Sequence, residues 1–302
     1  MSSRALEVAP AAPPKVTQFL YERTAPDTLT AFGVCECLYS GQTAYQQIEL
    51  WSSPDYGKIL MLDGELQSAS KDEFIYHEAL VHPAVVRSKN PRTALILGGG
   101  EGGTLRELLR VECIEKVTMV DIDGEVVDWC RTMMPEHAAG AFEDPRTELR
   151  IGDALKFLRE SKEQYDLIVS DLTEPTNVLN LSTSLFSVDA FRLVRARLAP
   201  GGIFSLQASQ GSLGQTRTHL EIVRNLRQVF RNVKTLLVHI PSFCCHWTFC
   251  LATDQASLSL SKEVVEARLS ERGVKGLKFF DGETDVRLKS LPKYLRKELR
   301  AL

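Results

Sequence analysis

Residues 93–103 read TALILGGGEGG, and this stretch decides the fold. An apolar run of strand length leads into a loop in which Gly98, Gly100 and Gly103 satisfy the pattern GxGxxG, and a helical pattern follows. A glycine loop between a strand and a helix is typical of a site for a nucleotide-like ligand, although a tight turn alone would also need glycines. Asp121 ends the next apolar run, eighteen residues after Gly103, and favours a ligand because a carboxylate there can bind ribose hydroxyls.

Seven apolar runs of strand length, most of them separated by helical patterns, follow residue 90. They are Thr93–Leu97, Val117–Ile122, Leu149–Ile151, Leu167–Val169, Ile203–Leu206, Val233–Ile240 and Thr248–Ala252. Short buried strands separated by amphipathic segments are typical of a parallel sheet with helices on both faces. We therefore predict an α/β fold with a mostly parallel sheet of seven strands, and we expect its ligands at the carboxyl ends of the strands.

The N-terminal part of the chain has a different pattern. Residues 1–15 are rich in Ala and Pro, and we expect them to form a flexible tail. Four extended segments divided by turn residues, such as Ser40-Gly41, come next. They are Val16–Glu22, Thr28–Tyr39, Thr43–Trp51 and Lys58–Leu62. This pattern predicts a small antiparallel β domain over residues 16–75, followed by the α/β domain over residues 76–302.

The composition excludes several classes of protein. Of the 302 residues, 44% are hydrophobic and 25% are charged, which is typical of a globular chain and excludes a disordered one. The net charge of -3 argues against a nucleic-acid-binding protein. No apolar run approaches the ~20 residues of a membrane span. The seven cysteines show no metal-binding spacing, and no secretory signal is recognisable, so we expect reduced thiols and a cytoplasmic location.

Glu101 argues against an ordinary dinucleotide in the glycine loop. Its carboxylate would repel a pyrophosphate bound there, although an acid at this position could also simply cap the helix. Carboxylates follow the other strands as well, and together the six are Glu101, Asp121, Asp123, Asp153, Asp171 and Glu174. So many like charges are costly to bury unless a cation compensates them. We therefore expect a cationic ligand, and an S-adenosyl compound that lacks the amino-acid carboxylate fits best.

The strand that ends in Asp171 supplies a candidate reaction centre. Residues 165–171 form an apolar strand that breaks into an acidic turn, with Glu174 three residues after Asp171. Asp171 could merely cap a helix. Beside a protonated amine, it could instead accept the proton that must leave before the nitrogen attacks, while Glu174 holds a neighbouring ammonium. A sulfonium leaves as a neutral thioether, so the transfer would need no metal, and proximity would supply much of the rate.

Taken together, these motifs resemble those of the polyamine synthases, or aminopropyltransferases. The matching stretches are YQ (45–46), MLDGELQ (61–67), DEFIYHE (72–78), GGGEGG (98–103), VDID (120–123), EVVD (125–128), GDA (152–154) and the turn at Asp171. They appear in order between about residues 40 and 254. Glu101, the FIYHE segment and HIPSF (239–243) look most like thermospermine synthases.

The resemblance implies a Rossmann-like fold of the class I methyltransferase type. It implies transfer of the aminopropyl group of decarboxylated S-adenosylmethionine to spermidine, which gives thermospermine or spermine and methylthioadenosine; putrescine is the alternative acceptor. No prosthetic group, metal, nucleic acid or membrane is expected as a partner. A homodimer or homotetramer is expected, because the family associates through its N-terminal domain.

The resemblance also assigns site residues. For donor binding it implies Gln46, His77, Gly98, Gly100, Glu101, Asp121, Ile122, Asp153 and Ala154. It implies Asp171 and Tyr76 as catalytic residues, and Gln67, Glu174, Gln207 and Phe243 along the polyamine channel. A purely structural role is the alternative for His77, and Trp247 is expected mainly in the core. Phe243 stands where spermidine synthases usually have Tyr, and its apolar ring suits an acceptor with more methylene surface.

One loop departs from the family, and three other functions compete with the leading one. Residues 175–186 lack the glycine that the family loop generally has, so we expect altered loop flexibility to affect acceptor choice and turnover. A methyltransferase is disfavoured because Glu101 and Asp171 would oppose the carboxylate of S-adenosylmethionine. Asp171 and Tyr76 argue against a non-catalytic polyamine-binding protein. Nothing in the sequence places hydride-transfer residues for a dehydrogenase.

Overall fold

The computed structural model describes residues 15–25, 27–174 and 181–302. The expected tail, apart from Lys15, and residues 175–180 of the departing loop lie outside these ranges. Within them, no helix combines the length and the apolar character needed to cross a bilayer.

The large sheet has seven strands, as predicted. They are β7 (Thr93–Gly98), β8 (Lys116–Asp121), β9 (Thr147–Ile151), β10 (Tyr165–Asp171), β11 (Leu198–Gln210), β12 (Asn232–Ile240) and β13 (Cys245–Thr253). Their spatial order is β12-β13-β11-β10-β7-β8-β9. The pairs from β11 to β9 are parallel, and β13 runs antiparallel to both of its neighbours. The prediction of a mostly parallel sheet is therefore confirmed.

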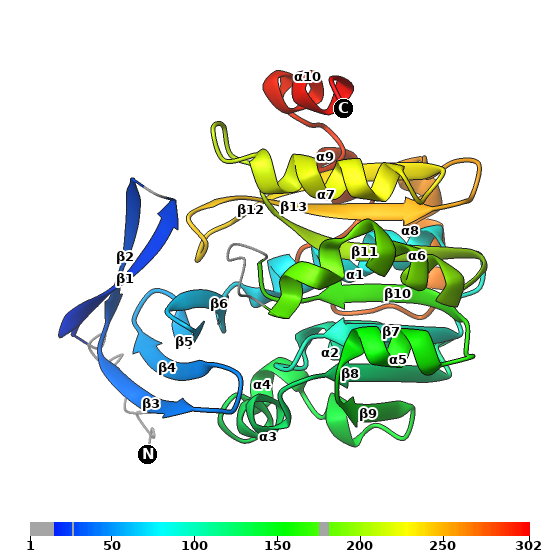
Figure 1. Cartoon of the computed structure of the whole chain (residues 1–302). Coiled ribbons are helices and arrows are strands. Elements are labelled where there is room, and N and C mark those ends of the chain that lie inside the picture. Colours follow the sequence, from blue (N-terminus) through cyan, green and yellow to red (C-terminus); the bar gives the residue numbers. More distant parts are fainter. Residues whose placement is uncertain (1–14, 26, 175–180) are drawn as a thin grey trace, which may run out of the picture.

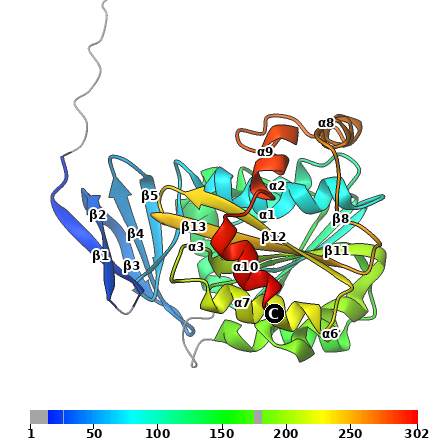
Figure 2. The ribbon, with the colours of Figure 1, turned by 90° about the horizontal axis from the view of Figure 1, so that it is seen from above.

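Helices cover both faces of this sheet, as Figure 2 shows for α1 and α8 on one side and α6 and α7 on the other. One face carries α1 (Glu73–Arg87), α2 (Gly103–Leu109), α4 (Pro135–Ala138), η1 (Ala141–Glu143), α8 (Lys262–Glu271) and α9 (Gly282–Leu288). The other carries α5 (Ala154–Glu160), η2 (Leu181–Phe186), α6 (Val188–Arg197), α7 (Arg217–Arg227) and α10 (Lys293–Arg300). Alternate residues of β7 serve the two cores: Ala94 and Ile96 face the first, Leu95 and Leu97 the second.

The small antiparallel part contains six strands in two sheets, where the sequence predicted four strands. β1 (Gln18–Ala25) and β2 (Thr28–Val34) form a hairpin. β3 (Glu36–Gln42), β4 (Gln47–Ser53), β5 (Gly57–Leu62) and β6 (Glu65–Ala69) form the second sheet. The sequence pattern missed β6 because its five residues, ELQSA, are mostly polar and are separated from β5 by only a two-residue turn.

Two expectations in this part are wrong. Thr28–Tyr39 is not one strand, because the chain leaves the hairpin at Cys35, whose N–H donates to the Ser52 carbonyl (2.8 Å), and then enters the other sheet. Ser40-Gly41 is not a turn, because both residues pair with β4, Gly41 opposite Ile48. Pairing between whole strands here outweighs the local preference of Ser and Gly for turns.

The second small sheet packs against α3 (Gly124–Met133), the helix that follows β8. Ile48 and Leu60 of the sheet share a buried cluster with Val126 and Cys130 of the helix. The small sheet therefore lies beside the carboxyl ends of the parallel strands of the large sheet (Figure 1). Helix α1 starts at Glu73, so the division that the sequence predicts near residue 75 falls within its first turn.

Candidate active site

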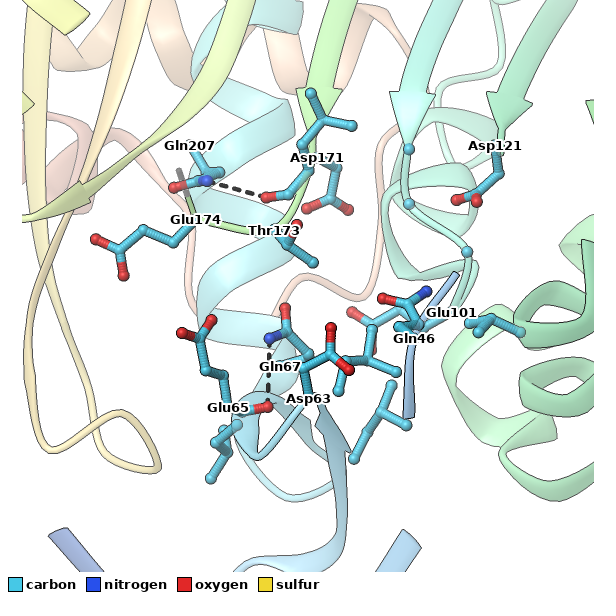
Figure 3. A pocket seen from close by; sticks show the side chains of 18 of the residues that line it. Gln46, Asp63, Glu65, Gln67, Glu101, Asp121, Asp171, Thr173, Glu174 and Gln207 are labelled. Carbon is cyan, nitrogen blue, oxygen red and sulfur yellow. Dashed lines mark hydrogen bonds between the residues drawn. The ribbon is translucent and has the colours of Figure 1, made fainter. Parts of the chain in front are cut away.

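A cavity of about 530 Å³ lies where the carboxyl ends of the parallel strands meet the small sheets. It is lined by every residue that the family resemblance assigned to the site except His77. These fourteen are Gln46, Gln67, Tyr76, Gly98, Gly100, Glu101, Asp121, Ile122, Asp153, Ala154, Asp171, Glu174, Gln207 and Phe243. In the view of Figure 3, Gln46, Glu101 and Asp121 lie toward one end, Glu174 and Gln207 lie toward the other, and Asp171 lies between them.

The glycine loop and the end of β10 meet at the point where the strand order reverses, between β7 and β10. The backbone N–H of Gly99 donates to the carbonyl of Asp171 (2.8 Å). Gly98 has a φ of +81°, and a Cβ there would collide with that same carbonyl oxygen. Only glycine lets the two strand ends come this close, which is what brings Asp171 to the loop.

Asp171 is held by two hydroxyl groups. Tyr76 Oη donates to Asp171 Oδ1 (2.8 Å), and Thr104 Oγ1 donates to Oδ2 (2.6 Å). Burial raises the pKa of Asp171 above its usual value, while nearby His77 and the two hydroxyls oppose the rise. Asp171 caps none of the described helices; its carboxyl group is held by the two hydroxyls, and its pKa lies above the usual value, as suits a candidate proton acceptor. The sequence did not single out Thr104, since one threonine at the start of a helix carries no motif signal.

Glu101 pairs with His77 beneath the loop. α2 begins without any side-chain cap, so Glu101 does not cap it. Glu101 Oε1 lies 2.7 Å from His77 Nε2, whereas Oε2 is buried without a hydrogen-bond partner among the described residues. Burial alone would raise the pKa of Glu101, but His77 lowers it below the usual value. Glu101 is therefore an ionised carboxylate of a cavity-lining residue, and one of its oxygens has no hydrogen-bond partner among the described residues.

Asp121 and Asp153 lie near the same end of the cavity. Burial raises the pKa of Asp121 to about 6, although its Oδ1 accepts the backbone N–H of Asp123 (2.9 Å). Asp153 caps α5, because its Oδ1 accepts the N–H of Leu155 (2.7 Å), and it also lines the cavity. Capping and ligand contact are thus compatible for this side chain.

Asp123, which the sequence placed at the acidic rim, does not line the cavity. It is 1% exposed and caps α3 with Oδ1, while Oδ2 accepts Thr43 Oγ1 (2.6 Å) and Gln46 Nε2 (3.0 Å). Thr43 lies in the turn before β4 and not in the strand that we expected from residue 43. Asp123 therefore ties the small sheet to α3 and orients Gln46 at the cavity wall.

The opposite end of the cavity combines polar and aromatic side chains. Burial raises the pKa of Glu174 to about 7. The hydroxyl of Ser209 donates to its carboxyl group, and this hydrogen bond opposes the rise. Gln207 donates to the Leu172 carbonyl (2.9 Å), which fixes the start of the turn after β10. The Phe243 ring meets Trp247 edge-on, with ring centroids 4.9 Å apart.

Glu22, Gln210 and Trp247 are among the lining residues that were not assigned to the site from the sequence. Glu22 comes from the β1–β2 hairpin and accepts the N–H of Leu66 (3.1 Å); burial raises its pKa to about 7. Trp247, expected mainly in the core, is 8% exposed and lines the cavity, and Gln210 lines it as well. Glu22 stands 152 residues before Glu174 in the chain, so no local motif could have joined them.

No metal centre is evident in the described part of the chain, where no group of three or more His, Cys, Asp or Glu side chains could hold an ion. All seven cysteines are free thiols.

Comparison with known proteins identifies the family. Residues 73–262 match the spermine/spermidine synthase domain, and residues 18–70 match the spermidine synthase tetramerisation domain. A polyamine aminopropyltransferase from Synechococcus sp. (strain JA-2-3B'a(2-13)) is 41% identical over 298 residues, which cover 95% of each chain. Thermospermine synthase ACAULIS5 from Arabidopsis thaliana is 38% identical over 257 residues, 83% of this chain and 74% of that one.

Solved structures agree with the sequence relatives. A spermidine synthase in complex with the transition-state analogue AdoDATO superposes with a TM-score of 0.87 at 28% identity, over 96% of this chain and 97% of that one. Spermidine synthase from Thermotoga maritima gives a TM-score of 0.86, also at 28% identity, over 96% of each chain. These matches confirm the Rossmann-like fold and leave the methyltransferase and dehydrogenase alternatives without support. The chain belongs to the spermine/spermidine synthase family and is an enzyme of the polyamine aminopropyltransferase class, which transfers alkyl groups other than methyl.

Proposed function

We propose that this enzyme transfers the aminopropyl group of decarboxylated S-adenosylmethionine to spermidine and releases methylthioadenosine, with thermospermine or spermine as the second product. The observation that carries the proposal is the position of Asp171 between two acidic ends of one cavity, with the cavity-lining Tyr76 donating to its carboxylate. Both substrates are cations, so an acidic cavity attracts each of them, and its centre has a group that can take up a proton.

The donor fits the end of the cavity formed by the glycine loop. Asp121 is proposed to bind the ribose hydroxyls, Asp153 the adenine, and the free oxygen of Glu101 the propylammonium. The remaining proposed donor residues complete this wall: Gln46, Gly98, Gly100, Ile122 and Ala154. The buried, unpartnered Oε2 of Glu101 supports a donor that carries an ammonium there and no carboxylate beside it, because a second anion would oppose this oxygen.

The transfer needs one proton to be removed and one bond to be exchanged. Asp171 takes a proton from the attacking ammonium, the freed nitrogen lone pair attacks the methylene next to the sulfonium, and the carbon–sulfur bond electrons return to sulfur. Methylthioadenosine leaves as a neutral thioether, and the new secondary amine carries the positive charge. Tyr76, which donates to Asp171 (2.8 Å), is proposed to position this carboxylate beside the attacking nitrogen.

The acceptor fits the opposite end, with Gln67, Glu174, Gln207 and Phe243 along the channel. Phe243 packs against Trp247 and offers apolar surface without a hydroxyl, which supports the longer triamine spermidine over the diamine putrescine. Putrescine stays the second candidate, because the two solved structures named above are spermidine synthases.

The test is direct incubation of the purified protein with decarboxylated S-adenosylmethionine and one amine at a time. Release of methylthioadenosine with spermidine, and chromatographic identification of thermospermine or spermine, would support the proposal. A higher kcat/KM with putrescine would make the protein a spermidine synthase. No methylthioadenosine release with any amine would contradict aminopropyl transfer.

Three features of the whole protein belong to the same proposal. The N-terminal β part over residues 16–75 serves association and supplies one wall of the cavity, and residues 76–302 carry the catalytic residues. The tetramerisation-domain match over residues 18–70 supports a homo-oligomer, a dimer or a tetramer. The free thiol state of all seven cysteines supports work in the cytoplasm.

A further inference from the structure

The imidazole of His77 lies beneath the glycine loop and outside the cavity. It is 1% exposed and is not among the side chains that line the cavity. A Cβ on Gly103 would lie 2.5 Å from His77 Cε1, so the last glycine of the loop is required by this ring. The loop and the histidine therefore form one packed unit, and a ligand in the cavity meets Glu101 and not His77.

His77 belongs to a row of buried and half-buried side chains whose charges alternate. Arg106 Nη2 lies 2.8 Å from Glu73 Oε2, this oxygen lies 2.7 Å from His77 Nδ1, and His77 Nε2 lies 2.7 Å from Glu101 Oε1. Burial alone would lower the pKa of His77, but Glu101 and Glu73 raise it well above the usual value. The ring is thus an imidazolium between two carboxylates, and the row ends at the cavity wall.

Other groups face this row without replacing His77. Asp171 Oδ2 is 4.0 Å from His77 Nε2, and Tyr76 meets the imidazole edge-on, with ring centroids 5.1 Å apart. His137 is buried nearby, and burial lowers its pKa, so it is neutral near pH 7. Among the described residues, His77 is the only cation that an ion pair places beside Glu101.

We propose that His77 is a positioning residue: it holds one carboxylate oxygen of Glu101, so that the other oxygen faces the ammonium group of the donor, and it does not touch the donor itself. This inference rests on the proposed function. It depends on the length of Glu101 as well, because an aspartate would withdraw the carboxylate from His77 by one bond of about 1.5 Å.

A double-mutant cycle of His77→Gln and Glu101→Asp separates this role from direct binding. Gln keeps polar atoms but loses the charge, so His77→Gln is expected to raise the KM for decarboxylated S-adenosylmethionine about tenfold or more at pH 7, with a smaller change in kcat. If His77 acts through Glu101, the double variant should be no worse than Glu101→Asp alone. If the two effects multiply, His77 binds the donor independently and the proposal is overturned.

The pH profile gives a readout that lost packing alone would not produce. In the wild type, His77 keeps the pKa of Glu101 below its usual value, so donor binding should not weaken until the pH is low. Without the imidazolium, burial should raise the pKa of Glu101, so donor affinity in His77→Gln should fall as the pH drops below neutral and recover as it rises. A donor KM with the pH dependence of the wild type would contradict the proposal.

His82→Gln is the matched control. His82 is on the same helix, is fully buried, and pairs with Glu107 (Nε2–Oε2 2.8 Å) away from the cavity. Its variant should lose thermal stability and keep the donor KM. If His77→Gln does not fold, the proposal is tested with Glu101→Asp alone, because this variant keeps a carboxylate and loses the contact with His77. A donor KM like that of the wild type in Glu101→Asp would then overturn the proposal. Wild-type protein that is inactive with every amine would instead overturn the proposed function.

Discussion

Asp171 is the side chain on which the proposed transfer depends most. We expect Asp171→Asn to keep the fold and the contact with Thr104, but to lower kcat by about 10²–10⁴-fold, because an amide cannot take up the proton of the attacking ammonium. Methylthioadenosine release under saturating substrates measures this. The control is Asp166→Asn, which should keep kcat. Asp166 lies at the other end of β10, and its carboxylate accepts hydrogen bonds from the backbone N–H groups of Arg92 and Thr93. Equal losses in both variants would contradict a chemical role for Asp171.

The hydroxyl of Tyr76 tunes the same carboxylate. It stabilises ionised Asp171, so Tyr76→Phe should raise the pKa of Asp171 further. Since the base must be ionised to act, activity rises with pH through this pKa, and the acidic limb of the profile should move to higher pH. The measurement is kcat/KM for spermidine between pH 5 and 9, with Tyr294→Phe, whose hydroxyl bonds the distant Gly211 carbonyl, as the control. An unmoved acidic limb would show that the hydroxyl does not act on the base.

Among the elements, the strands of the large sheet were predictable because their signals are local. Each buried strand is a short run of consecutive apolar residues. Neighbouring residues such as Ala94 and Leu95 of β7 face two different cores, and such a run is needed only where both faces of the sheet are covered. The carboxyl ends of parallel strands lie on the same side of the sheet, so the acids that follow these strands gather there. The positions of the glycine loop, Asp121 and Asp171 could therefore be predicted without a structure.

The remaining parts of the fold and the site depend on contacts between segments far apart in the chain. β6 is polar and short, and its place is set by pairing with β5. Glu22 lines the cavity only because the hairpin folds back onto Leu66. No sequence pattern predicted that Asp123 would turn away from the rim, because the Thr43 and Gln46 groups that bind it come from the turn before β4, 80 and 77 residues earlier in the chain.

The link between α3 and the small sheet can be tested at Asp123. Asn caps helices about as well as Asp, so Asp123→Asn should keep α3 intact. With the single oxygen of Asn on the Val126 N–H, the amide NH2 faces Thr43 and Gln46 and can accept from neither. Gln46 should therefore lose its orientation, and the donor KM should rise several-fold while the acceptor KM stays unchanged. Asp281→Asn, at the cap of α9, controls for the loss of a cap carboxylate. An unchanged donor KM would remove Gln46 from the donor site.

The whole molecule brings Glu22 of the hairpin and Glu174 of the large sheet to one cavity, along with Arg23 and Glu65. Burial raises the pKa of both Glu22 and Glu174 to about 7, so in the empty enzyme each is partly protonated near neutral pH. A bound polyammonium favours the ionised form, so spermidine binding at pH 6.5 should release protons, and the release should shrink toward pH 8.5. Calorimetry in two buffers of different ionisation enthalpy measures the number of protons released per spermidine bound. Glu22→Gln should lower it, and proton uptake would contradict the assignment.

The hairpin has two faces with different tasks, and this predicts a coupling between assembly and acceptor binding. Glu22 points into the cavity, whereas Phe19, Tyr21 and Leu29 on the opposite face are 57%, 66% and 61% exposed. A two-stranded hairpin is marginally stable alone, and so large an apolar face favours contact with a second copy of the chain. This agrees with the tetramerisation-domain match over residues 18–70. Association should therefore hold Glu22 in place at the cavity.

Replacing Phe19, Tyr21 and Leu29 together by Ser should lower the molar mass measured by light scattering. Because the loosened hairpin carries Glu22, the KM for spermidine should rise several-fold, while the donor KM, set by the glycine loop on the rigid sheet, should change little. Ser at Val264 and Val286, exposed apolar residues of α8 and α9, should leave mass and both KM values as they are. If the triple variant dissociates yet keeps its acceptor KM, the hairpin positions Glu22 without help from a partner, because its contacts with Leu66 and Gln210 then suffice.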